Sequence, residues 1–188
     1  MNGVLRFSFL CGGLTLQPQS KRVKPLCRGH VKLELLPSSF PQGLDPLRID
    51  HIAIAVRSIE EGAEVLGRLL SYQRLTRTVT NSRQKVNVLF LGKPGSLDIK
   101  LIEPSDAESP LWPFIRRGGG LHHVCFKVDD VVDACAALAE KGARVLAPPA
   151  PGEAFDDNLI AFCYLGLGLN AELIGTDARR NRLDDAAS

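Results

Sequence analysis

The stretch that decides the fold of this chain is residues 118–130, which read GGGLHHVCFKVDD. The pattern predicts a glycine turn, a β-strand and the acidic start of a helix. Because side chains alternate along a strand, His122 and His123 are expected to point to opposite faces, so that at most one of them faces a given site. A buried histidine needs a hydrogen-bonding partner, and for an isolated histidine a satisfied place in the core is the simplest interpretation.

A second stretch of the same build changes that interpretation. Residues 50–62 read DHIAIAVRSIEEG, with His51 early in a strand that ends in valine, followed by a capping residue and an acidic first helical turn. The stretch around His123 has the same order. The chain therefore contains an internal repeat of a histidine-bearing βα unit.

The remaining periodicity extends each copy into a module of order βαβββ, over about 47–104 and 120–175. The first module is expected to have a helix at 58–70, capped by Ser58, and strands at 73–80, 85–92 and 97–103. A linker with a short helix follows at 106–117. The second module is expected to have a helix at 131–141 and strands at 144–147, 159–165 and 170–174. The fold class is α+β: two βαβββ modules that form a cupped mixed sheet within a domain at 46–176.

The two ends of the chain differ from this domain. Residues 1–45 have no clean period and recurrent prolines, and they are predicted to form a disordered basic N-terminal extension. A transit peptide there is not excluded. Residues 177–188 are predicted to be a charged C-terminal tail.

Composition narrows the class of protein. The formal net charge of +2 gives no indication of binding to nucleic acid or to an anionic membrane. No apolar run is long enough for a membrane span. The five cysteines are scattered and never form a C-x-x-C motif, which argues against a disulfide framework and favours a cytoplasmic protein.

The last predicted strand carries an acidic residue, Glu172, between apolar neighbours. It lies either on an exposed face or opposite a partner. If it converges with His51 and His123, two imidazoles and a carboxylate form a ligand set that suits Zn²⁺, Fe²⁺, Mn²⁺ or Co²⁺.

Several segments resemble the vicinal oxygen chelate (glyoxalase/dioxygenase) superfamily, and within it methylmalonyl-CoA epimerase. They are DHIAIAV at 50–56, IEPSDAESPLWPFI at 102–115, GLHHVCFKVDD at 120–130, LAEKGARVL at 138–146 and AELI at 171–174. The resemblance implies the glyoxalase-like fold around one divalent metal (Co, Zn, Mn, Ni or Fe). His51, His123 and Glu172 are the implied ligands. It also implies an isomerase or lyase that stabilises the enediolate of an acyl-CoA or another acyl thioester, and a possible homodimer.

One position departs from the family pattern. Where the epimerases resemble IELLEP, this chain reads IKLIEP, which places Lys100 at the fourth ligand position. A protonated lysine has no lone pair for a metal. Lys100 could pair with Glu172 and abolish the metal site, which leaves a metal-free small-molecule-binding protein. It could instead act catalytically, together with Glu172, beside a three-ligand metal. Thirdly, the three ligands could form an Fe(II) site of the extradiol dioxygenase type.

Overall fold

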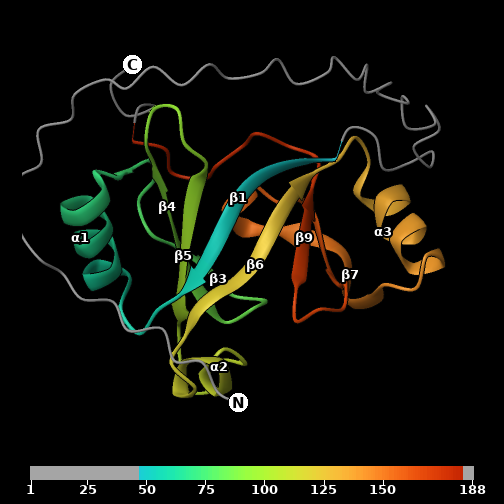
Figure 1. Cartoon of the computed structure of the whole chain (residues 1–188), viewed down its shortest axis with the longest axis horizontal. Coiled ribbons are helices and arrows are strands. Elements are labelled where there is room, and N and C mark those ends of the chain that lie inside the picture. Colours follow the sequence, from blue (N-terminus) through green and yellow to red (C-terminus); the bar gives the residue numbers. More distant parts are fainter. Residues whose placement is uncertain (1–46, 184–188) are drawn as a thin grey trace, which may run out of the picture. The chain divides into compact units, whose positions relative to one another are not determined.

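The computed structural model describes residues 47–183 (Figure 1). The predicted extension at 1–45 lies outside the described residues. The described strands form one mixed sheet in the order β2-β4-β5-β1-β6-β9-β8-β7, and β3 pairs with β4. The sheet and its flanking helices confirm the predicted α+β fold.

The first module contains β1 (Arg48–Ala55), α1 (Ile59–Leu70), β2 (Gln73–Arg74), β3 (Val79–Asn81), β4 (Val86–Gly92) and β5 (Asp98–Pro104). The linker holds α2 (Trp112–Arg116). The second module contains β6 (Gly120–Lys127), α3 (Val131–Glu140), β7 (Arg144–Gly152), the 3-10 turn η1 (Glu153–Phe155), β8 (Asn158–Tyr164) and β9 (Asn170–Ile174).

The two modules repeat each other in topology. In each, the first strand pairs in parallel with the last one, β1 with β5 and β6 with β9. The two first strands, β1 and β6, then join the modules by antiparallel pairing at the centre of the sheet (Figure 1). The histidine-bearing strands are therefore direct neighbours, which is what brings the two halves of the site together.

Two strands differ from the prediction. The segment expected as one strand at 73–80 is split into β2 and β3, and between them the Leu75 amide donates to the Phe90 carbonyl oxygen. The strand expected at 144–147 continues through three prolines to Gly152. Proline is tolerated there because β7 is the last strand in the sheet order, where one side of the backbone needs no partner.

Helix α1 begins where its sequence signal placed it. The Ser58 hydroxyl accepts a hydrogen bond from the Glu61 amide at 3.2 Å, as a capping box requires. The carboxylate of Glu103 on β5 accepts a second bond, at 2.7 Å, from the amide of Ile59. Glu103 thus faces α1, on the opposite side of β5 from Lys100, and its role is structural.

The core is divided into three clusters by the sheet. One cluster packs α1 against β4 and β5, and another packs α3 against β8 and β9; Figure 1 shows the two helices beside opposite halves of the sheet. The third cluster mixes both modules: Phe90 of the first and Phe155 of the second have ring centroids 5.7 Å apart. The sheet must curve for these side chains to meet, so this third cluster fills the inside of the predicted cup.

No helix of the described part is long and apolar enough to cross a membrane. Cys125, Cys135 and Cys163 are buried free thiols. The cytoplasmic location inferred from the cysteine pattern stays a prediction.

Candidate active site

Four buried ionisable side chains converge inside the cup. They come from four neighbouring strands: His51 from β1, Lys100 from β5, His123 from β6 and Glu172 from β9. None is more than 3% exposed. Oε2 of Glu172 lies 3.0 Å from Nε2 of His51 and 3.1 Å from Nε2 of His123. The structure therefore brings together every site residue that the sequence had singled out.

Lys100 is bonded to the same carboxylate. Its Nζ donates to Oε1 of Glu172 at 2.8 Å and to Oε2 at 2.9 Å. The ammonium group also lies 4.8 Å from the ring centroid of Phe155 and 5.8 Å from that of Phe90. The ion pair between Lys100 and Glu172 that the sequence analysis considered is thus present.

The charge of Lys100 governs the protonation of Glu172. Burial by itself raises the pKa of Glu172, but the charge of Lys100 and the hydrogen bonds from His123 and His51 outweigh it, and the net pKa lies well below its ordinary value. Burial lowers the pKa of His123 to about 3, so its ring is neutral at pH 7. Glu172 is thus a carboxylate that accepts from Lys100 and His123, and Nε2 of His51 lies 3.0 Å from the same Oε2 atom.

The residue before each histidine holds that histidine in place. Asp50 Oδ1 lies 2.6 Å from Nδ1 of His51, and Nδ1 of His122 lies 2.9 Å from Nδ1 of His123. In both cases the contact engages Nδ1 and leaves Nε2 turned toward Glu172. The internal repeat therefore extends to this orienting contact.

The contact contradicts the expectation that neighbouring histidines point to opposite faces. His122 and His123 line the same cavity. The pairing of β1 with β6 shifts register between Ile49/His51 and between Ala53/Ile54, so Asp50 and His122 are the extra residues of two bulges. A bulge interrupts the alternation of side chains, and a single sequence carries no clear sign of it.

His122 is the functional candidate that the sequence analysis set aside. His123 donates from Nε2 to Glu172, so its Nδ1 carries the lone pair and accepts from Nδ1 of His122. His122 then keeps a lone pair on Nε2. Burial, and next the charge of Lys100, lower the pKa of His122, which keeps the ring neutral.

A cavity with a volume of about 400 Å³ is lined by Lys100, His122 and His123. Its ionisable lining consists of Arg83, Lys100, His122 and His123. Apolar side chains supply much of the rest, among them Ile102, Leu111, Leu146 and Phe162. Such a cavity, mostly apolar with a few convergent polar groups, is typical of a small-molecule site.

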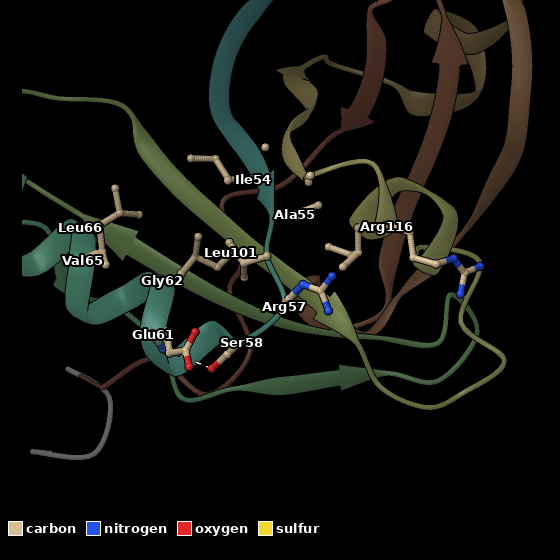
Figure 2. A pocket seen from close by; sticks show the side chains of 15 residues that line it. Ile54, Ala55, Arg57, Ser58, Glu61, Gly62, Val65, Leu66, Leu101 and Arg116 are labelled. Atoms are coloured by element: carbon tan, nitrogen blue, oxygen red, sulfur yellow. Dashed lines mark hydrogen bonds between the residues drawn. The ribbon is translucent and has the colours of Figure 1, made fainter.

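A second cavity of about 520 Å³ lies between α1, β1 and the glycine turn at 118–120 (Figure 2). Its lining is largely apolar, with Arg57 and Arg116 as its cationic side chains. None of the four convergent groups lines it. The chemistry therefore belongs to the smaller cavity.

Arg179, in the segment that follows β9, is another buried charged residue. Arg179 is 6% exposed, forms an ion pair with Asp50, and lies 4.7 Å and 4.9 Å from the ring centroids of Phe90 and Phe155. Its chain segment is fixed by hydrogen bonds between main-chain groups, such as the Arg180 amide to the Ala154 carbonyl oxygen. This part of the predicted tail is thus packed into the fold.

Comparison with known proteins identifies the family. The profile of the Glyoxalase/Bleomycin resistance protein/Dioxygenase superfamily matches residues 50–164. The chain belongs to this superfamily. The resemblance seen in the sequence is thereby confirmed.

Named relatives within the superfamily are epimerases. The ethylmalonyl-CoA/methylmalonyl-CoA epimerase of Cereibacter sphaeroides is 33% identical over 106 residues, which are 55% of this chain and 78% of that protein. An uncharacterised protein of Bacillus subtilis is 36% identical over 100 residues, 53% of this chain and 70% of that protein. The solved Streptomyces coelicolor methylmalonyl-CoA epimerase has a TM-score of 0.61 at 27% identity and covers 70% of this chain and 98% of its own. These epimerases are enzymes, as the sequence analysis expected of this chain.

Three of the four convergent residues fit a divalent metal. The candidate ligand atoms of His51, His123 and Glu172 lie within 4.8 Å of one another. The distances of about 3 Å from Glu172 Oε2 are those between ligands that share one ion at about 2.1 Å. These residues are candidate metal ligands.

Lys100 does not fit such an ion. A metal bound to Glu172 would share that carboxylate with the ammonium group. At about 4 Å two unit charges repel by about 4 kcal/mol at an effective dielectric constant of about 20, and a divalent ion is repelled about twice as strongly. Lys100 also already engages both carboxylate oxygens. The complete set therefore disfavours a divalent ion as long as Lys100 carries its charge.

Proposed function

We propose that this member of the superfamily is an epimerase-type isomerase that exchanges the proton on the carbon α to an acyl thioester carbonyl. The observation that carries the proposal is the cavity in which the ammonium of Lys100 and the neutral imidazole of His122 face one small volume. The names of its epimerase relatives support the thioester as substrate class.

The two groups have complementary roles in this reaction. An ammonium group has three N–H donors, and Glu172 accepts two of those of Lys100. The third is available to the thioester oxygen, where negative charge develops when the α-proton leaves. The lone pair on Nε2 of His122 accepts that proton. Water then delivers a proton to the opposite face of the enolate, which inverts the carbon and regenerates the thioester, and His122 returns its proton to solvent.

Glu172 acts through Lys100 in this proposal. It is completely buried, and its bonds to Nζ fix the ammonium group at the cavity wall. Asn87, the polar residue inside β4, is engaged elsewhere: its amide donates to Glu103 at 3.0 Å. It therefore offers no second base to the cavity.

A relative offers a chemical parallel. A methylmalonyl-CoA epimerase at 27% identity and a TM-score of 0.60 was solved in complex with methylmalonyl-CoA and NH4+. Lys100 supplies an ammonium group of the same charge from within the chain. The parallel supports methylmalonyl-CoA as the first substrate to test.

The test is incorporation of deuterium at the α-carbon of methylmalonyl-CoA in D₂O, followed by NMR with the full-length chain in EDTA. Wild type should catalyse exchange, and His122→Ala should slow it by at least about 100-fold. Arg74→Met, which alters an exposed ion pair, is the control and should retain the wild-type rate. Failure of the wild type to exchange the α-protons of methylmalonyl-CoA and of related acyl thioesters would refute the proposal.

A second candidate is a metal-free small-molecule-binding protein, and the Lys100–Glu172 ion pair favours it because the pair neutralises the site. Tight binding of the thioester without α-proton exchange would identify such a binding protein.

The dioxygenase alternative needs an iron site, which the charge of Lys100 opposes. Oxygen uptake with catechols would support that alternative. A homodimer stays a prediction.

A further inference from the structure

We infer that Lys100 is the resident cation of this site and that its ammonium group takes the place of the divalent metal, which the native chain does not bind there. The inference rests on the proposed function only for the identity of the ligand. It concerns which positive charge holds that ligand.

The first argument is how completely the ammonium group is held. Lys100 is 3% exposed, and its Nζ engages both oxygens of a carboxylate that is itself 0% exposed. The faces of Phe155 and Phe90 lie near the same charge. Aromatic faces and a carboxylate stabilise a desolvated cation, so this environment is built for the ammonium group.

The second argument is charge balance. Two carboxylates are bonded to the histidines of the site, those of Asp50 and Glu172, and each already has a cationic partner: Arg179 for Asp50 and Lys100 for Glu172. A divalent ion needs uncompensated negative charge or neutral donors near it. Neither carboxylate supplies such charge.

The third argument excludes the neighbouring cluster as a replacement site. Asp50, His51 and Cys125 form the other candidate group in the described part of the chain. The carboxylate of Asp50, the acidic member of this cluster, is already paired with Arg179. Metals bind cysteine as the thiolate, histidine as the neutral imidazole and aspartate as the carboxylate, and here the carboxylate charge is already compensated.

The experiment is titration of metal-stripped, full-length protein with Co²⁺, read by its visible absorption and by plasma mass spectrometry. Wild type should show no stoichiometric site. Lys100→Gln, which removes the charge and adds a carbonyl ligand, should bind one equivalent at least about 100-fold more tightly than wild type. The double variant Lys100→Gln/His123→Ala should lose that site. Lys85→Gln, at an exposed lysine paired with Glu108, is the matched control and should behave as wild type.

Lys100→Met provides a second variant, because it removes the charge without adding a ligand and should also gain affinity through the three remaining donors. Thermal melts establish that each variant is folded. One equivalent of Co²⁺ in wild type that disappears in His123→Ala would overturn the inference. Folded Lys100→Gln and Lys100→Met proteins that bind no more Co²⁺ than wild type would also overturn it.

This result is independent of the activity test. A wild type that excludes Co²⁺ and gains it through Lys100→Gln supports the inference even where no thioester undergoes exchange, and in that case only the proposed function fails.

Discussion

Replacement of Arg179 by methionine should destabilise the protein strongly, although Arg179 lies beyond the segment that defines the family. Its side chain is 5% exposed and that of its partner Asp50 is 10% exposed. At such burial the pair belongs to the class in which removal of one partner leaves an uncompensated charge and costs about 3–5 kcal/mol.

One feature of the wild type reduces that loss. The Nε atom of Arg179 is buried without a hydrogen-bond partner, and an unsatisfied buried donor costs about 1–3 kcal/mol. Methionine removes this donor while its side chain still packs on Phe90 and Phe155. With the middle of each range, the expected loss in the free energy of unfolding is about 2 kcal/mol.

The charge of Asp50 provides the internal check. Burial raises the pKa of Asp50, but the hydrogen bond from His51 and the charge of Arg179 outweigh it, and the net pKa is lowered. Without Arg179 that pKa rises. The double variant Arg179→Met/Asp50→Asn, which has no orphaned charge, should recover more than half of the stability lost in Arg179→Met.

The assay is urea unfolding at pH 7. Unchanged m-values would show that the substitution alters stability alone. Arg74→Met is the matched control: it breaks a pair with Glu60 whose side chains are 39% and 66% exposed, and it should cost less than about 1 kcal/mol. A loss below about 1 kcal/mol for Arg179→Met, or a loss as large for the control, would refute the reasoning.

Three further predictions follow from the same geometry. Burial lowers the pKa of His123 to about 3, so between about pH 6.5 and pH 3 this histidine takes up a proton in the unfolded chain but not in the folded one. The free energy of unfolding should therefore fall by up to about 5 kcal/mol as the pH drops from about 6.5 toward 3. Urea denaturation at a series of pH values measures this loss. Glu172→Gln removes the counter-charge of Lys100 and should cost about 3–5 kcal/mol in urea unfolding, unlike Glu60→Gln, whose exposed pair should cost under about 1 kcal/mol. Ser58→Ala removes the cap of α1 and should cost about 1 kcal/mol, while Ser58→Asp should restore it; an unchanged melting temperature in Ser58→Ala would contradict the capping contact.

The sequence by itself determined the repeat, the α+β fold and the convergent residues. A strand or an amphipathic helix follows from local periodicity, so β9 was predicted to the residue, and α1 with its cap to within one. The repeat implied that His51 and His123 occupy equivalent strands. The lysine at the fourth ligand position, Lys100, was visible from the comparison of IKLIEP with the family motif.

Only the tertiary structure decided what these residues do to one another. The bulge that turns His122 into the cavity depends on the register between β1 and β6, which local sequence does not encode. The bond from Lys100 to Glu172 joins strands from different modules, and the contact of Arg179 with Asp50 spans nearly the whole described chain. Such contacts join residues far apart in the sequence, so the spacing of residues does not predict them. The physical reason that they form is that a buried charge is costly unless a partner compensates it.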